Sequence, residues 1–484
     1  MKFLVKLFPE IIIKSKPVRK KFTKQLRDNL RKLLLPLDPN LEIIRDWDRI
    51  TIETVSEDPE VLAGFVAVLS NTPGISHFVE VLEYPLVDVH DIYEKTRLAI
   101  GNSLRGKSFV VRCKRVGKHD FNSSEIERYV GGGLNQYVES AGVDLHNPDV
   151  TVRIEVRQDV VYIVNRRIEG LGGFPLGTID AAVSLISGGF DSTVSSYLTM
   201  KRGMRTHFCF FNLGGREHEV GVKEVALYLW LKYGASHRVK FVSVPFEDVV
   251  GEILKNVENS QMGVILKRMM LRAASEVAAQ LEVAALVTGE AVAQVSSQTL
   301  QNLSVIDQVT DTLVLRPLIC ADKLDIINIA AKIGTEAFAA NMPEYCGVIS
   351  VKPTTRAKPE KIAAQEANFD FSVLERAIAS ANYINIDALA DEDLTVAAVE
   401  SLPIPLPDAV IVDVRHPDEV DRKPLKMISS EIQTIPFYEL HSRFAQLDQS
   451  RTYMLYCDKG VMSRLHASHL VEQGFENVKV YRPS

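Results

Sequence analysis

The 484-residue sequence is poor in cysteine and has no long apolar run. Its five cysteines are odd in number and widely separated, which excludes a disulfide framework and a CxxC zinc site. They are Cys113, Cys209, Cys320, Cys346 and Cys457. Every apolar run is shorter than the roughly 18 residues that a membrane span requires, so we expect no membrane partner. Internal repeats and low-complexity tracts are absent as well, which excludes a repeat architecture.

The first residues also lack the features of a signal peptide. Lys6 and Glu10 interrupt the apolar stretch MKFLVKLFPEIIIKSK, and no small-residue cleavage site follows. We therefore expect a cytoplasmic protein, in which a disulfide would be catalytic rather than structural. With 46% hydrophobic and 24% charged residues, the chain has the composition of a globular protein, and its length suffices for about three domains.

The net charge of -6 conceals a basic N-terminal end. Residues 1–32 contain eleven basic and two acidic side chains, a charge of +9, which leaves -15 for the remainder. Clustered Lys and Arg attract a polyanion, so an acidic protein with one basic end can hold nucleic acid there. A solvated helix face explains the same cluster, and both interpretations stay open at this point.

Residues 1–168 have the pattern of two small α+β units. In the first, residues 2–7, 48–54 and 76–82 are predicted strands, and residues 17–35 and 58–70 are predicted helices. The helix at 17–35 carries Phe22, Leu26, Leu30 and Leu33 on one stripe. In the second, from about residue 84, residues 109–116 and 150–170 alternate as strands around a helix at 123–138. Basic side chains beside the strand at 109–116 extend the positive character, namely Lys107, Arg112, Lys114, Arg115, Lys118 and His119.

From residue 180 to about 345, buried strands alternate with helices. The predicted strands cover 181–187, 206–212, 238–246 and 283–290, and the predicted helices 191–202, 219–233, 262–281 and 322–332. This alternation indicates a doubly wound parallel sheet. Residues 355–400 are polar and helix-prone, and LPIPLP at 402–407 marks a domain border. Beyond it, strands at 409–414, 452–457 and 478–481 and a helix at 462–473 predict a further small α/β unit.

The sequence SGGFDS at 187–192 follows an apolar strand and precedes a helix. A glycine turn at that position points backbone N–H groups at an anion bound at the carboxyl end of the sheet. Gly188 and Gly189 let the backbone approach a phosphate, and Ser187 and Ser192 can donate hydrogen bonds. Asp191 would instead hold Mg²⁺ or order the loop. The loop lacks the lysine of GxxxxGK[ST] and the spacing of GxGxxG, which disfavours a P-loop NTPase or dinucleotide fold; an ordinary glycine turn is the remaining alternative.

SGGFDS resembles the SGGxDS signature of the ATP pyrophosphatases, which cleave ATP to AMP and pyrophosphate. The C-terminal segments VIVDVRHPDE, IPFYEL and YCDKGVMSRLHA resemble a rhodanese domain, in which Cys457 would stand at the start of a loop ahead of a helix. A thiolate or persulfide is favoured there by backbone N–H groups and by Lys459 and Arg464. A buried core cysteine is the alternative.

The other cysteines have less to suggest chemistry. Cys209, inside an apolar strand, and Cys113, inside a strand of the second unit, are predicted to be structural, and Cys320 beside Lys323 is ambiguous. Cys346 lies in the predicted loop PEYCGV and is the better partner for Cys457.

The order of these units resembles the bacterial tRNA 4-thiouridine synthetases of the long form, over essentially the whole chain. Matching segments include KRVGKHDFNSSEIER, SLISGGFDS, LVTGEAVAQVSSQT, RPLICADK, PEYCGV and CDKGVMSR. The resemblance implies a multidomain α/β and α+β protein with a ferredoxin-like domain, a THUMP domain, a doubly wound ATP pyrophosphatase domain and a rhodanese domain. The expected bounds are 1–82, 63–167 with a core at about 84–167, 178–350, a helical linker at 351–405, and 406–484.

The resemblance also implies roles for particular residues. ATP contacts are expected from Leu185, Ile186, Ser187, Gly188, Gly189, Asp191, Ser192, Lys267, Gly289 and Gln298. The expected catalytic residues are Cys457 as persulfide carrier, Cys346 as its resolving disulfide partner, Asp191 and Lys323. For tRNA we expect contacts from Lys20, Lys21, Lys24, Arg112, Lys114, Arg115, Lys118 and His119. The cofactors would be ATP and Mg²⁺.

The activity that the resemblance implies is ATP-dependent sulfur transfer to uridine 8 of tRNA, giving 4-thiouridine. A cysteine desulfurase would load Cys457 with sulfur. Two alternatives remain: sulfur donation to a small sulfur-carrier protein for thiamine thiazole synthesis, which could run in addition, and a tRNA-binding protein whose ATP loop is only a switch. The reactive cysteine pair argues against the second alternative.

Overall fold

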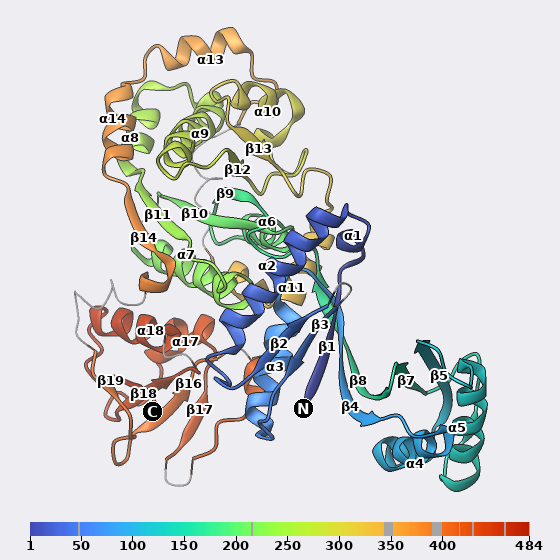
Figure 1. Cartoon of the computed structure of the whole chain (residues 1–484). Coiled ribbons are helices and arrows are strands. Elements are labelled where there is room, and N and C mark those ends of the chain that lie inside the picture. Colours follow the sequence, from blue (N-terminus) through green and yellow to red (C-terminus); the bar gives the residue numbers. More distant parts are fainter. Residues whose placement is uncertain are drawn as a thin grey trace. The chain divides into compact units, whose positions relative to one another are not determined.

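The computed structural model describes residues 1–46, 49–213, 216–342, 352–389, 399–415, 417–427, 430–458 and 461–483. The chain divides into two compact units, Met1–Thr178 and Ile179–Ser484. Figure 1 follows the chain from the N-terminus through both units. None of the helices in these described ranges is both long enough and apolar enough to cross a membrane.

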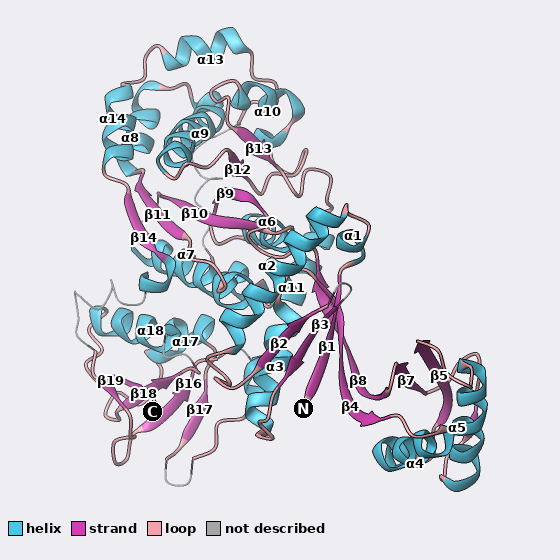
Figure 2. Cartoon of the chain, in the orientation of Figure 1, coloured by secondary structure: helices cyan, strands magenta, loops and turns pink. Residues whose placement is uncertain are grey.

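One eight-stranded sheet runs through the whole first unit, in the order β2-β3-β1-β4-β8-β7-β5-β6. Its strands are β1 Lys2–Leu7, β2 Glu42–Arg45, β3 Arg49–Glu53, β4 Ile75–Pro85, β5 Ser108–Val116, β6 Gly142–Val143, β7 Val150–Arg157 and β8 Val160–Gly172. The long strands β4 and β8 pair antiparallel from Ile75 and Gly172 to Pro85 and Val160. The two predicted α+β units therefore share a sheet, and β4 and β8 connect them (Figure 2).

Each half of this sheet has its own helices and its own core. The helices are α1 Pro9–Ile12, α2 Lys16–Leu34, α3 Pro59–Asn71, α4 Val89–Ile100 and α5 Ser123–Tyr137. The first core contains Phe22, Leu26, Leu30 and Leu34 of α2, four residues apart, because this spacing keeps them on one helix face. The second core joins α4 and α5 to β5, β7 and β8. Separate cores on one sheet explain why the sequence pattern predicts two units.

The second unit begins with a six-stranded sheet in the order β13-β12-β9-β10-β11-β14. The strands are β9 Ile179–Leu185, β10 Met204–Asn212, β11 Lys240–Pro245, β12 Ala285–Val287, β13 Leu313–Leu315 and β14 Asn382–Asn385. All pair in parallel except β14, which is antiparallel to β11. Chain order reverses between β9 and β12, so the carboxyl ends of these two strands form the switch point where such sheets bind ligands.

Helices cover both faces of this sheet, as a doubly wound fold requires (Figure 2). They are α6 Phe190–Lys201, α7 Arg216–Leu229, α8 Glu247–Asn256, α9 Met262–Gln280, α10 Leu300–Asp307, α11 Lys323–Ile333, α12 Glu336–Asn341, α13 Pro359–Glu366 and α14 Phe371–Ala379. Ile362 of α13 and Leu374 of α14 are buried in the same core as α8 and α9. The segment expected as a linker at 351–405 is thus shorter, because α13, α14 and β14 complete this domain.

The last part of the chain is a five-stranded parallel sheet in the order β15-β19-β18-β16-β17. Its strands are β15 Ser401–Leu402, β16 Val410–Asp413, β17 Ile432–Thr434, β18 Tyr453–Tyr456 and β19 Val478–Tyr481, with helices α16 Pro417–Arg422, α17 Phe437–Phe444 and α18 Val461–Glu472. The predicted strands at 409–414, 452–457 and 478–481 and the helix at 462–473 are confirmed to within a few residues.

Candidate active site

The loop at 187–192 connects β9 to α6 and is held in a fixed shape by its own side chains. Gly188 has a φ of +82°, a conformation that favours glycine. The Ser192 hydroxyl accepts a hydrogen bond from the backbone N–H of Ser187 at 3.1 Å and donates to the Gly189 carbonyl at 3.3 Å. The loop thereby leads directly into the N-terminus of α6, whose first N–H groups have no partner within the helix. This arrangement suits a phosphate group.

The segment just after β12 touches this loop at Gly289. A Cβ atom on Gly289 would lie 2.6 Å from the carbonyl carbon of Asp191 and 2.6 Å from the amide nitrogen of Ser192. Both atoms belong to the backbone, which cannot move aside cheaply. Glycine is therefore required where the two neighbouring strand ends meet, and Gly289 fixes the distance between them.

Asp191 is held by two side chains from other elements. Lys323, at the start of α11, donates to both carboxylate oxygens at 2.9 and 3.1 Å, and its ammonium lies 5.4 Å from the centroid of the Phe190 ring. Gln294 donates to the same carboxylate at 2.7 Å. The adjacent Ala293 has a φ of +63°, so a strained backbone presents Gln294 to the loop. Gln294 had no signal in the sequence, since an isolated amide side chain is common in any loop.

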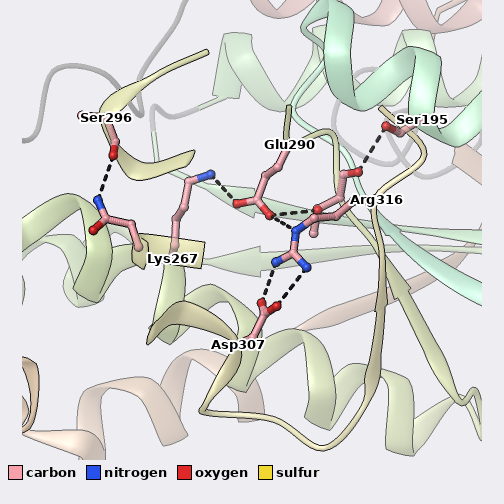
Figure 3. A network of polar contacts seen from close by, with 8 residues as sticks. Ser195, Lys267, Glu290, Ser296, Asp307 and Arg316 are labelled. Carbon is pink, nitrogen blue, oxygen red and sulfur yellow. Dashed lines mark hydrogen bonds and ion pairs between the residues drawn. The ribbon is translucent and has the colours of Figure 1, made fainter. Parts of the chain in front are cut away.

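A second polar cluster lies beside Gly289 (Figure 3). The carboxylate of Glu290 accepts from Lys267 of α9 at 2.7 Å, from Arg316 at 2.8 Å and from the Thr288 hydroxyl at 3.1 Å. Arg316 in turn donates to both carboxylate oxygens of Asp307. Burial alone would raise the pKa of Glu290, but the charges and hydrogen bonds of Lys267 and Arg316 outweigh it and lower the pKa to about 2. Glu290 is therefore ionised at neutral pH.

The residues expected at the ATP site lie together at the carboxyl end of the sheet. Leu185 ends β9 and Ile186 follows it. Lys267 contacts Glu290, the neighbour of Gly289, and Gln298 is buried in the turn that follows Gln294. The backbone N–H of Ala293 donates to the carbonyl of Gln298 at 3.0 Å, which closes that turn.

His218 of α7 also contacts this loop, and the sequence pattern does not predict it. Its Nε2 atom lies 3.1 Å from the carbonyl oxygen of Ser187, and its ring packs edge-on against Phe210. Burial lowers the pKa of His218, while the contact with Ser187 opposes that change.

Cys457 follows β18 and stands just before α18. Its side chain is 7% exposed, and its sulfur accepts from the backbone N–H of Ser463 at 3.4 Å. The Cys457 thiol also lies 3.5 Å from the Ser463 hydroxyl. A backbone N–H that donates to this sulfur suits a thiolate or a terminal persulfide. Cys346 and Lys459 lie outside the described residues, so the pairing of Cys346 with Cys457 stays a prediction.

A buried ion pair supports the strand ends beneath Cys457. Arg415 donates to both carboxylate oxygens of Asp413 at 2.9 and 2.6 Å and to Asp458 at 3.0 Å. Burial by itself would lower the pKa of Arg415, but its bonds to Asp413 raise that pKa above its usual range. The guanidinium also lies 5.1 Å from the centroid of the Tyr456 ring. The residues on either side of Cys457 are thus held rigidly.

The remaining described cysteines differ from Cys457 in their surroundings. Cys209 is fully buried in β10, and burial raises the pKa of its thiol; its prediction as a core residue is confirmed. Burial and the nearby Glu127 raise the pKa of Cys113 to about 12. Cys320 is exposed.

The residues expected to bind tRNA lie on the first unit. Lys20, Lys21 and Lys24 are exposed on α2. Arg112, Lys114 and Lys118 are exposed on β5 or just beyond it, whereas Arg115 and His119 are partly buried. The Nδ1 atom of His119 accepts from Arg115 at 3.1 Å, and its ring stacks on Phe121 with ring centroids 5.3 Å apart. Exposed cations of this kind attract a polyanion.

Four family models match successive parts of the chain. They are the ThiI ferredoxin-like domain at residues 2–79, the THUMP domain at 87–165, the thiamine biosynthesis protein (ThiI) at 177–371 and the rhodanese-like domain at 401–484. Together with the loop at 187–192 and the loop of Cys457, they define the class: an adenylating, ATP-dependent sulfurtransferase.

Full-length relatives narrow the class to a family. The chain is 56% identical over 484 residues to the tRNA sulfurtransferase of Azotobacter vinelandii and 55% identical to that of Shewanella pealeana, with 100% of each chain covered. It belongs to the tRNA sulfurtransferase family. Among solved structures, a 4-thiouridine synthetase in complex with RNA and bound ATP aligns with a TM-score of 0.70 and 26% identity, over 80% of this chain and 99% of that one. PH1313 from Pyrococcus horikoshii shares the fold, with a TM-score of 0.53 and 21% identity, over 69% of this chain and 100% of that one.

Proposed function

We propose that this chain uses ATP to adenylate uridine 8 of tRNA and then replaces the activated oxygen with sulfur carried by Cys457, which gives 4-thiouridine. The observation that carries the proposal is the rigid loop at 187–192, set at the switch point of the sheet in a chain that also presents a cysteine loop. We further propose that this chemistry takes place in the cytoplasm.

The first step is activation of the uracil base. The O4 oxygen of uridine 8 attacks the α-phosphorus of ATP, pyrophosphate leaves, and O4 becomes part of an adenylate that can depart as AMP. Leu185, Ile186, Gly289 and Gln298 would border the nucleotide. Lys267 and Lys323 would neutralise phosphate charge as it develops on the leaving pyrophosphate.

The residues present also fit a Mg²⁺ ion bound with the nucleotide. Asp191 offers carboxylate oxygens at the loop, and Mg²⁺ is commonly held by one or two carboxylates together with substrate phosphates. When bound there, the ion would supply additional positive charge to the phosphates. Lys323 and Gln294 keep the Asp191 carboxylate oriented in any case.

Sulfur transfer then proceeds through Cys457. A cysteine desulfurase, as donor, would convert the Cys457 thiol to a persulfide. Its terminal sulfur attacks C4 of the adenylated base, AMP leaves, and C4 is joined to Cys457 through two sulfurs. The Cys346 thiolate attacks the Cys457 sulfur, so a Cys346–Cys457 disulfide forms and the thiolated base is released with both electrons of the broken bond. A dithiol reductant must then restore both thiols.

A single reconstitution tests the proposal. The full-length protein is incubated with unmodified tRNA, ATP, Mg²⁺, a cysteine desulfurase and cysteine, and 4-thiouridine is followed by its near-ultraviolet absorbance. We expect thiolation that needs ATP and is absent when cytidine replaces uridine 8. Equal product without ATP, or from the cytidine tRNA, would contradict the proposal.

A second function of the same cysteine is supported by the family description, which names thiamine biosynthesis. The Cys457 persulfide would pass its sulfur to a small sulfur-carrier protein. This route needs Cys457 and not the ATP loop, so an Asp191→Asn variant should lose tRNA thiolation and keep transfer to the carrier. Loss of both activities in that variant would argue against a separate route.

A further inference from the structure

The side chain of Lys267 is held in place by a hydrogen bond to another residue of the site. Its ammonium donates to the buried Glu290 at 2.7 Å, and this bond spans 23 residues of sequence, from the second turn of α9 to the loop that follows β12. Figure 3 shows the two side chains pointing toward each other. A lysine side chain has a flexible four-carbon stem and can place its charge in many positions. A fixed acceptor such as Glu290 restricts the ammonium to one of them.

The acceptor itself is fixed from two further sides. Thr288 donates to the Glu290 carboxylate from the end of β12, and Arg316 donates to it from the end of β13. Arg316 is aligned by its paired bonds to Asp307, so its guanidinium is occupied by two carboxylates. Arg316 therefore acts as an anchor for Glu290 rather than as a phosphate ligand.

The charges of the cluster balance, because Lys267 and Arg316 face the carboxylates of Glu290 and Asp307. The Glu290 side chain is 8% exposed, whereas the Lys267 side chain is 25% exposed. Lys267 is therefore the cation of the pair that has surface left for a ligand. An ammonium has three donors, and the bond to Glu290 leaves two to turn toward phosphate.

Glu290 is also joined to the phosphate loop through the backbone. It follows Gly289 directly, and Gly289 touches the backbone of Asp191 and Ser192. The dipeptide Gly289-Glu290 thus contacts the backbone of the phosphate loop and also fixes the position of the Lys267 ammonium.

We infer that Glu290 is a positioning residue, which holds the ammonium of Lys267 against the triphosphate of ATP and is itself anchored by Arg316 and Asp307. This inference rests on the proposed function of the loop at 187–192 as an ATP site. It concerns nucleotide binding and not the sulfur chemistry, so the two can fail separately.

The test compares full-length variants by ATP binding, measured by titration calorimetry with a non-hydrolysable ATP analogue, and by tRNA-dependent pyrophosphate release. Glu290→Gln keeps the size and the acceptor oxygen but removes the charge. We expect its Kd for the analogue and its KM for ATP to rise about 10-fold, with kcat within about 3-fold of wild type.

A double-mutant cycle distinguishes positioning from a structural role. If Glu290 acts through Lys267, Glu290→Gln adds no further loss of affinity to Lys267→Met. The same 10-fold loss in both backgrounds would overturn the inference, as would an unchanged Kd in the single Glu290→Gln variant.

Glu366→Gln is the matched control. Glu366 is likewise buried and pairs with Arg268 and Arg272 of the same helix α9, away from the phosphate loop. We expect it to lower stability and to leave the Kd for the analogue unchanged; a rise equal to that of Glu290→Gln would reduce the effect to helix packing and overturn the inference. If Glu290→Gln fails to fold, Asp307→Asn replaces it in the test, because the Asp307 side chain is 40% exposed. We expect Asp307→Asn to raise the Kd about 2-fold to 3-fold, and an unchanged Kd would overturn the inference. A wild-type protein that binds the analogue but never thiolates tRNA would remove the proposed function alone.

Discussion

Cys457 lies between β18 and α18, and a backbone N–H in the first turn of α18 donates to its sulfur. The backbone N–H of Ser463 lies 3.4 Å from it, whereas Cys209 is enclosed by the apolar core and burial raises the pKa of the thiols of Cys209 and Cys113. A backbone N–H donor stabilises a thiolate or a persulfide. Cys457 has such a donor, although the residue is only 7% exposed.

Replacing this one sulfur should separate the two half-reactions. In Cys457→Ser we expect tRNA thiolation to fall at least 100-fold while tRNA-dependent pyrophosphate release stays within about 3-fold of wild type, because adenylation does not involve the cysteine. Thiolation and pyrophosphate are measured in the same samples. The exposed Cys320 offers the control, and Cys320→Ser should retain both activities. Undiminished thiolation by Cys457→Ser would remove the persulfide from the mechanism.

His207 should make the stability of β10 depend on pH. Burial, and then the charges of Arg205 and Lys240, lower the pKa of His207 to about 4, and its Nδ1 accepts from the backbone N–H of Lys240 in β11 at 3.0 Å. The unfolded chain, with a histidine pKa of about 6.5, binds the proton first. Stability is therefore complete above pH 7, falls as the pH drops from about 6.5 to about 4, and levels off below that.

Amide hydrogen exchange at Lys240 reports this effect locally. Between pH 7 and pH 4 the protection of that amide should fall by the equivalent of about 1 to 3 kcal/mol in the wild type. His207→Asn keeps an acceptor oxygen near the Nδ1 position and does not titrate, so its protection should fall by clearly less. An equal fall in both proteins would mean that other groups cause the loss.

At the scale of elements, the sequence predicts those parts that repeat a local pattern. The strand, the two glycines and the helix around residues 187–192 are adjacent in the chain, and so their role follows from their order. Glu290 and Gln294 escape such reasoning, because their partners Lys267 and Asp191 are 23 and 103 residues away. Likewise β14 pairs with β11 across more than 130 residues, so a polar, helix-prone stretch was expected as a linker although its strand completes the sheet.

The close approach of β12 to the phosphate loop predicts a specific glycine requirement. In Gly289→Ala the new methyl group would lie 2.6 Å from backbone atoms of Asp191 and Ser192, so the loop must move. We expect the affinity for an ATP analogue to fall at least 10-fold in titration calorimetry, since the N–H groups at the start of α6 would no longer face the phosphates.

A second glycine of the same domain controls for the substitution itself. Gly263 lies in the first turn of α9, and a Cβ built there meets no atom within 4 Å apart from its chain neighbours and the helix's own backbone. Gly263→Ala should leave nucleotide affinity unchanged and raise stability by about 0.5 to 1 kcal/mol, because alanine loses less backbone entropy in a helix. Normal ATP affinity in Gly289→Ala would show that the loop tolerates the displacement.

At the scale of the whole molecule, the positive charge is concentrated at the N-terminal end and the rest of the chain is acidic. The net charge of +9 on residues 1–32 contrasts with -15 on the remainder, and Lys20, Lys21 and Lys24 are exposed on α2. The acidic remainder repels tRNA at long range, so tRNA binding must depend on local basic surfaces. Such binding releases counterions, and its dependence on salt counts the phosphates that are neutralised.

The salt dependence of tRNA affinity therefore tests the role of α2 directly. Replacing Lys20, Lys21 and Lys24 together by Gln should weaken binding about 10-fold or more at low salt and reduce the slope of log K against log salt by about 2 to 3, because up to three phosphate contacts are lost. Lys255, exposed on α8 in the ATP domain, provides the comparison, and Lys255→Gln should leave the slope unchanged. An unaltered slope in the triple variant would mean that these lysines form a solvated helix face and do not contact tRNA. Binding would then depend on the basic residues at and beyond β5, and Arg112→Gln and Lys114→Gln should reduce the slope instead.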